Sequence, residues 1–260
     1  MNIFSLILLL LVMASSGCKK VIDGDSTNIP ICESPQKFYA MNNGSSSFRM
    51  VYGGDGRVES FCRGFDEDFS IQKDVITDDE GFIRQILEPN LDGSEGIDTL
   101  DVIYSDDLVV GISFYDYWGG THLYEYSYDN SNRIISLDIN NSYTNNTDRY
   151  TYTYTIDNVT RMDYYQINDG VTSHLFKFLY TYDNQPNPYS EIDEKYHSFL
   201  LGWQSIFPLS SNNITQVDVF NADNFLYSKS YIYSYRADGY PESGFEAPEF
   251  NGFDISYFYQ

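Results

Sequence analysis

A hairpin pattern that recurs along the chain constrains its fold most. In the clearest copy, residues 124–135, tyrosines occupy every second position, Asp129-Asn130 follows, and Ile134-Ile135 begins a second extended run. Alternation with a period of two is typical of a strand whose two faces differ. Asp and Asn tolerate the backbone of a tight turn. Each copy therefore predicts two antiparallel strands joined by a turn.

Further copies lie at residues 51–58, 76–83, 103–109, 150–159, 179–184 and 231–240. Successive copies are about 23 to 28 residues apart, with one gap of double length before the last, as expected of supersecondary repeats. Two strands per copy give roughly 14 to 18 strands in which sequence neighbours pair. Open twisted sheets rarely exceed about ten strands. We therefore expect an all-β fold, a long curved antiparallel meander sheet that is open or barrel-like.

One segment departs from this period. Between residues 190 and 207 the apolar positions follow one face of a helix, at Ile192, Tyr196, Phe199, Leu200, Trp203 and Phe207. Prolines flank the segment on both sides, as they often flank helices. We expect one amphipathic helix near residues 190–207 that packs on the sheet or caps the open end of a curled one.

The first 17 residues predict an export signal. Their apolar block, Ile3 to Met13, is shorter than the about 20 residues that span a bilayer. Small residues 14–17 then precede Cys18, as at a secretory cleavage site. No Lys or Arg precedes Cys18, which departs from the usual charged start. The alternative is a buried hydrophobic helix with an incidental cysteine.

This signal predicts three parts of the chain: a lipoprotein signal peptide at 1–17, a lipidated Cys18 with a polar tether at 18–35, and a single β domain of hairpin repeats at 36–260. Each buried methylene of an acyl chain contributes about 0.8 kcal/mol to membrane binding. The predicted partner of Cys18 is thus the lipid bilayer. We expect a lipid-anchored outer-membrane protein, with its periplasmic or cell-surface side left open.

The chain is strongly acidic, with a formal net charge of −23. Such a charge repels phosphate backbones, which argues against nucleic-acid binding. It argues equally against a domain lying flat on anionic lipid.

Two resemblances add to this interpretation. Ser15-Ser16-Gly17-Cys18 resembles the relaxed lipobox of Bacteroidetes lipoproteins, and the Tyr-x-Tyr-Asp-Asn-x-x-Arg-Ile pattern at 126–134 resembles the tyrosine–aspartate hairpin repeats of large bacterial surface and toxin-shell proteins. The ordered set at 180–188, 208–215 and 233–241 resembles Bacteroidetes lipoproteins that carry a domain of unknown function with a porin-like fold. This likeness, over about residues 45–245, implies a curved antiparallel sheet and a lipid anchor. It implies no catalytic residue.

The chemistry-bearing residues form no recognisable catalytic motif. His122, His174 and His197 have no metal-ligand spacing, and neither a nucleophile elbow nor a phosphate-binding glycine loop occurs. Carboxylates such as Asp78 fall at predicted turns, where aspartate is expected for turn formation alone. Ca²⁺ sites at 66–68 or 106–107 are the less favoured interpretation. We predict no catalytic residue, no metal and no cofactor, and hence no enzyme.

The alternating aromatic residues carry the one specific functional hypothesis. Tyrosine and tryptophan rings suit stacking on sugars and are enriched at interfaces. The predicted ligand-stacking residues are Tyr124, Tyr126, Tyr128, Tyr150, Tyr152, Tyr154, Trp118 and Trp203. The alternative, which we favour, is that these tyrosines stabilise the sheet through cross-strand pairs.

The function predicted is a membrane-anchored envelope lipoprotein that acts as a non-enzymatic binding module for glycan or another envelope component. The alternative is a structural or protein-interaction lipoprotein with no small ligand. A glycan-active hydrolase and a membrane-spanning barrel are less favoured. Lipid-facing strands of membrane barrels are apolar, whereas here one face of the strands is Thr-, Ser- and Glu-rich. Cys32 and Cys62 either form a disulfide or remain separate buried thiols.

The anchor is tested by Cys18→Ala. Without the thiol no diacylglycerol can be attached, so the protein should leave the membrane fraction or stall as the uncut precursor. Detergent phase partition of labelled cells measures this. Retention of the variant in the detergent phase, at wild-type level, would contradict a lipid anchor at Cys18.

Overall fold

The computed structural model describes residues 38–42, 47–53, 57–65, 68–89, 97–115, 120–192, 196–204, 209–247 and 254–259. The predicted signal peptide, Cys18, Cys32 and the tether lie outside these ranges. Within them the chain forms sixteen strands, a 3₁₀ helix η1 (Pro188–Glu191) and a helix α2 (His197–Gln204). The strands are β1 (Phe38–Asn42), β2 (Ser47–Tyr52), β3 (Val58–Phe65), β4 (Asp68–Thr77), β5 (Ile83–Pro89), β6 (Ile97–Ser105), β7 (Leu108–Tyr115), β8 (Thr121–Tyr128), β9 (Ile134–Asn141), β10 (Asn146–Thr155), β11 (Asn158–Asn168), β12 (Val171–Pro186), β13 (Asn212–Asn221), β14 (Asn224–Tyr235), β15 (Pro241–Ala247) and β16 (Asp254–Tyr259).

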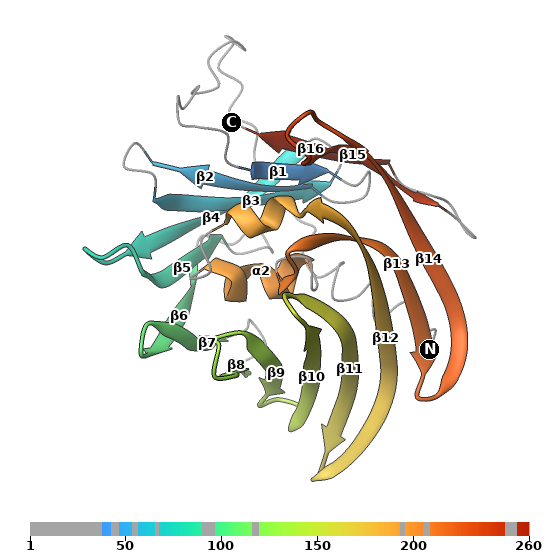
Figure 1. Ribbon diagram of the computed structural model, residues 1–260. Coiled ribbons are helices and arrows are strands. Elements are labelled where there is room, and N and C mark those ends of the chain that lie inside the picture. The colour runs from blue at the N-terminus through green and yellow to red at the C-terminus, as the bar shows by residue number, and fades with distance from the viewer. Residues whose placement is uncertain are drawn as a thin grey trace.

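Every strand pairs antiparallel with its sequence neighbours, and β1 also pairs with β16, so that the strand order closes into a barrel. The curved sheet surrounds α2 (Figure 1). The predicted antiparallel meander is confirmed, and closure resolves the alternative between an open and a barrel-like sheet. Neither helix of the described ranges is long and apolar enough to cross a membrane.

The tyrosine-bearing face of the strands points into the barrel. Tyr126, Tyr152 and Tyr180 are buried on three hairpins and belong to one continuous hydrophobic core with Ile, Val, Leu, Met and Phe side chains. On either side of Tyr126 along β8, Glu125 and Ser127 are exposed. The barrel therefore has a packed apolar interior, and β8 presents polar side chains on its outer face.

Five tyrosines make the same hydrogen bond. The hydroxyls of Tyr104, Tyr128, Tyr154, Tyr182 and Tyr233 donate to the carbonyl oxygens of Ile83, Val109, Ile134, Val159 and Ile214, with oxygen–oxygen distances between 2.5 and 2.8 Å. Each tyrosine lies near the end of the first strand of one hairpin, and each carbonyl lies near the start of the second strand of the hairpin before it.

The register explains why this bond recurs. The ladder between β7 and β8 ends at the pair Gly111 and Glu125, so Tyr128 lies three residues beyond the last pair and Val109 two residues before it. The other four bonds stand in the same relation to their ladders. At this end of the barrel, neighbouring hairpins diverge while each hairpin stays paired internally. The tyrosine hydroxyl supplies a donor to a carbonyl that the ladder no longer satisfies.

The helical segment is shorter than predicted and is interrupted. Asn187 caps η1 by accepting a hydrogen bond from the Tyr189 backbone N–H, and Ile192 returns to extended backbone before α2 begins. The expectation of one continuous helix near 190–207 is therefore wrong in its bounds. Its apolar face is as predicted where it is described, because Ile192, Tyr196 and Phe199 are buried.

The segment lies inside the barrel and does not merely cover its end. The Tyr126 hydroxyl donates to the Ser198 carbonyl oxygen over 3.0 Å, and the Phe199 ring lies 6.3 Å from that of Phe61. Strands on opposite parts of the sheet, β3 and β8, thus hold α2 between them, as Figure 1 shows.

Tyrosine-to-phenylalanine substitution tests the repeated bond. We expect Tyr128→Phe and Tyr154→Phe each to lower the free energy of unfolding by about 0.5–1.5 kcal/mol, because each leaves a partly buried carbonyl without its donor. Tyr143→Phe is the control, since its side chain is 74% exposed. Urea denaturation measures all three. Equal stability of Tyr128→Phe and the control would contradict a structural role for the hydroxyl.

Candidate functional site

The turns at one end of the barrel form a rim, here called the turn rim, at residues 78–82, 105–108, 129–133 and 155–158. Asp129 organises one of them. Its Oδ1 accepts from the backbone N–H groups of Ser131 and Arg133, at 2.8 and 3.1 Å, and its Oδ2 accepts from the Arg133 guanidinium. Asp78 repeats the arrangement with its own turn and Arg84. Aspartate at these positions is thus explained by turn formation.

Arginines then link one turn to the next. Arg133 donates from Nη1 to the Ile156 carbonyl oxygen, and its guanidinium lies 4.7 Å from the centre of the Tyr154 ring. Arg57 contacts the carbonyl oxygens of Asp78 and Asp79 in the same way. Arg133 thus joins two turns of the rim, and Arg57 joins the turn at 78–82 to the chain before β3.

A cavity of about 490 Å³ opens at the turn rim, between its four hairpin turns and the helical segment. Small-molecule sites typically measure about 300–1,000 Å³. Apolar side chains such as Val109 and Ile134 form part of its wall, beside Tyr128 and Tyr154. Hydroxyl-bearing residues form another part: Ser131, Ser190, Ser198, Ser210 and Ser211. The cavity thus combines an apolar wall with many hydrogen-bonding groups.

The charges around this cavity are mostly negative. Asp107 and Asp157 line it, and Arg133 is the only cationic side chain among the described lining residues apart from a protonatable His197. Arg133 is ion-paired with Asp129 at 2.7 Å. That hydrogen-bonded pair lowers the pKa of the Asp129 carboxyl and raises the pKa of the guanidinium. The positive charge of Arg133 is therefore already compensated.

The tyrosine hydroxyls at the cavity are uncharged donors. Burial raises the pKa of Tyr128 and Tyr154 well above the ordinary value. His197 Nε2 donates to the Ile192 carbonyl oxygen over 2.9 Å. Among the described residues, no group of three His, Cys, Asp or Glu side chains is placed to hold a metal ion.

The structure separates the predicted stacking residues. Tyr128 and Tyr154 line the cavity. Tyr126 and Tyr152 are core residues, 6% and 8% exposed, so no ring face is left for a sugar, and truncation of either would cost about 3–5 kcal/mol of stability. This placement corrects their predicted role.

The remaining predicted residues lie elsewhere. Tyr124 and Tyr150 are partly buried and pack against the core, with the Tyr150 ring stacked on Tyr164 at 4.9 Å. Trp118 lies outside the described residues, and the side chains of Trp203 and Cys62 do so too, although their backbones belong to α2 and β3. The disulfide between Cys32 and Cys62 stays a prediction.

Ser198 and the other serines of the helical segment were not predicted. Ser198 is 3% exposed and lies between His197 and Phe199 on α2. Nothing in the local sequence distinguishes it from an exposed helical serine. Arg133 could have been singled out from the sequence, because it lies four residues after Asp129 in the clearest repeat.

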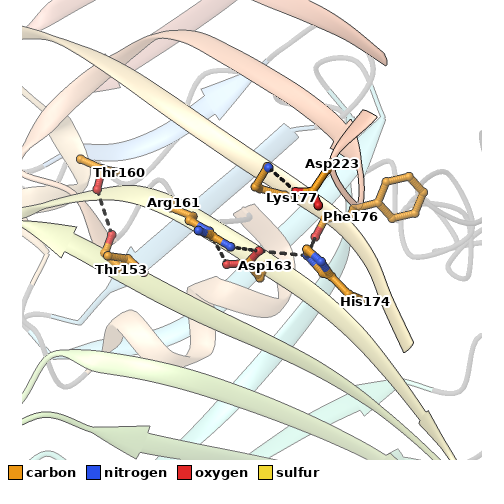
Figure 2. Close-up of polar contacts among 8 residues, drawn as sticks. All are labelled: Thr153, Thr160, Arg161, Asp163, His174, Phe176, Lys177 and Asp223. Atoms are coloured by element: carbon orange, nitrogen blue, oxygen red, sulfur yellow. Dashed lines mark hydrogen bonds and ion pairs between the residues drawn. The ribbon is translucent and has the colours of Figure 1, made fainter. Parts of the chain in front are cut away.

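A second polar cluster lies on the outer face of β11 and β12 (Figure 2). Asp163, which is only 5% exposed, accepts from Arg161 at 2.6 and 2.8 Å and lies 2.9 Å from His174 Nε2. Lys177 binds Asp223 at 3.1 Å and lowers the pKa of that carboxyl. These contacts join β11, β12 and the turn before β14. They pair each of these charges with a neighbouring side chain.

Comparison with known proteins bears on the fold. No protein-family model matches the chain, and no curated protein matches it. A crystal structure of a porin-like protein from Bacteroides uniformis ATCC 8492 is similar, with a TM-score of 0.57 and 12% identity over 87% of this chain and 98% of that one. A porin-like protein from Bacteroides vulgatus ATCC 8482 gives a TM-score of 0.53 and 10% identity over 86% and 99%. The chain therefore has a porin-like fold.

The hydrogen bonds that Asp129 accepts in its turn predict that the stability of the fold depends on pH. The lowered pKa of Asp129 stabilises the fold at pH values above the ordinary value of 3.8, and this stabilisation is lost as the pH falls from there through the folded pKa. Asp129→Asn keeps the turn acceptor but removes the charge. We expect the difference in Tm between wild type and variant, measured by circular dichroism, to shrink between pH 5 and pH 2. A constant difference would contradict the assignment.

Proposed function

We propose that this protein is a lipid-anchored, non-enzymatic envelope protein that binds part of a glycan in the cavity at the turn rim. The single observation that carries the proposal is this cavity of about 490 Å³, in which Tyr128 and Tyr154 stand beside several hydroxyl groups. Sugar rings present apolar faces and many hydroxyls, and sites for small ligands combine apolar walls with a few placed polar groups. The acyl chains on Cys18 hold the domain at the outer membrane.

The distribution of side chains supports a domain that works outside the bilayer. Arg149 and Asp138 form an ion pair on the outer face of β9 and β10, and Glu125 and Thr153 are exposed on neighbouring strands. Membrane-spanning barrels show an apolar outer band. A lipid anchor is then the means of attachment, and the porin-like fold serves as a scaffold for the rim.

A structural or interaction role without a small ligand is the second candidate. It is favoured by Ile232 and Phe245, which are 63% and 38% exposed and stand opposite each other on β14 and β15. Such a cross-strand apolar pair can contact another protein. Measuring whether the protein binds glycans separates the two candidate functions.

Blocking the cavity tests glycan binding. We expect the mature chain, from Cys18 onward in detergent, to bind a subset of bacterial glycans on an array, and Ser131→Trp to lose that binding because Ser131 lines the cavity. Ser127→Trp is the matched control, since Ser127 is exposed on β8 outside the cavity. Silence of the wild type across the array would overturn the proposal in favour of an interaction role. Unchanged binding by Ser131→Trp would place the glycan elsewhere.

A further inference from the structure

Ser198 is the most unusual polar group in the cavity wall. Only 3% of the residue is exposed, and it lines the cavity from the first turn of α2. Its carbonyl oxygen accepts from Tyr126, but its hydroxyl has no hydrogen-bond partner within the described residues. A buried hydroxyl without a partner costs free energy. A ligand atom in the cavity would supply the missing partner.

The neighbouring serines differ in this respect. The Ser190 hydroxyl donates to the Asn187 carbonyl oxygen over 2.6 Å. The Ser210 hydroxyl lies 2.9 Å from the Tyr182 hydroxyl and accepts from the Val159 backbone N–H. The tyrosine hydroxyls donate to backbone carbonyls, as described above. Ser131 and Ser211 also have no hydroxyl partner within the described residues, but both are exposed to water. Ser198 is thus the buried hydroxyl of this wall that is free to bond a ligand directly.

The charges decide which ligand fits. Arg133 is held by Asp129 and the Ile156 carbonyl, so it offers no free positive charge. Asp107 and Asp157 stand at the mouth with no ion pair among the described residues. Like charges brought together at a binding site cost several kcal/mol where water is displaced. An acidic ligand is therefore disfavoured, and an uncharged hydroxyl-bearing ligand is not.

We propose that the cavity selects uncharged sugar rings over acidic ones, that the Ser198 hydroxyl bonds one hydroxyl of the ring, and that Asp107 and Asp157 exclude carboxylates. This inference rests on the proposed glycan binding and adds the class of sugar. It gives Ser198 the role of binding a hydroxyl of the sugar ring.

A matched pair of small ligands tests the selectivity. Methyl β-glucoside and methyl β-glucuronide share a ring and differ in the group at C6, and the corresponding galactosides provide a second pair. We expect NMR titration of the mature chain to show at least about tenfold weaker binding of each uronate at low salt, with a smaller difference at 0.5 M salt because the carboxylates at the mouth are exposed. The double variant Asp107→Asn with Asp157→Asn should bring the two affinities to within about threefold.

The serine is tested in the same titration. Ser198→Ala should weaken binding of the neutral ring by about threefold to tenfold, the value of one neutral hydrogen bond. Ser211→Ala is the control, because Ser211 lines the cavity but is exposed at its mouth, and it should bind as the wild type does.

Each outcome has a distinct meaning. If the protein binds none of these sugars and no array glycan, both proposals fail. If neutral and acidic rings bind equally, glycan binding stands and the selectivity is overturned. If selectivity is seen but Ser198→Ala binds as the control does, the contact at Ser198 is overturned. Thermal unfolding of Ser198→Ala at the wild-type temperature shows that a loss of binding is not a loss of fold.

Discussion

The hydrogen bond from a tyrosine hydroxyl to a backbone carbonyl, repeated from hairpin to hairpin, is the interaction on which the turn rim depends. A barrel of this size must let its hairpins diverge at one end, because only the pairing inside each hairpin continues to the turn. Divergence leaves backbone carbonyls in a partly buried place without donors. A tyrosine is long enough to reach across the gap, and its hydroxyl, whose pKa burial raises further, is a neutral donor. The spacing of the tyrosines in the sequence is the spacing of these gaps.

The same arrangement explains why an aromatic-rich chain need not present an aromatic surface. Rings that support the hydroxyls must point inward, and there they pack around α2 with the aliphatic residues of the core. Charged side chains are left for the outer face, where they pair with neighbours across the strands, as Arg149 does with Asp138. Among the described residues the interior is filled by the barrel's own side chains and one inserted segment, and a cavity of about 490 Å³ lies where that segment meets the rim.

Much of this fold could be predicted from the sequence, because its main determinant is local. Alternation with a period of two and Asp-Asn or Asp-Gly turns define a hairpin within a dozen residues, and repetition of the pattern orders the meander. Closure could not be predicted, since it depends on the pairing of β1 with β16, whose sequences carry no mutual signal. The break between η1 and α2 depends on the Asn187 cap and on extended backbone at Ile192, which a count of apolar positions does not register.

The cavity could not be predicted from the sequence for a related reason. Its key residue, Ser198, gains its meaning from burial against Tyr126 and not from any neighbour in sequence, and the orientation that removed Tyr126 and Tyr152 from the surface is a property of the whole sheet.

The pairing of Phe38 with Tyr259 fixes a direction for the whole molecule. Because β1 runs from there toward the turn it shares with β2, and β2 ends near the same rim as the other hairpin turns, the chain enters the barrel on the side where the cavity opens. A domain held by a lipid upstream of β1 would consequently hang with its binding face toward the bilayer. Under that proposed anchoring, the number of residues between Cys18 and Phe38 would set how closely a bulky polymer could approach the mouth. Shortening this stretch would occlude the mouth against the membrane, while lengthening it would let the domain turn and sample the space beyond.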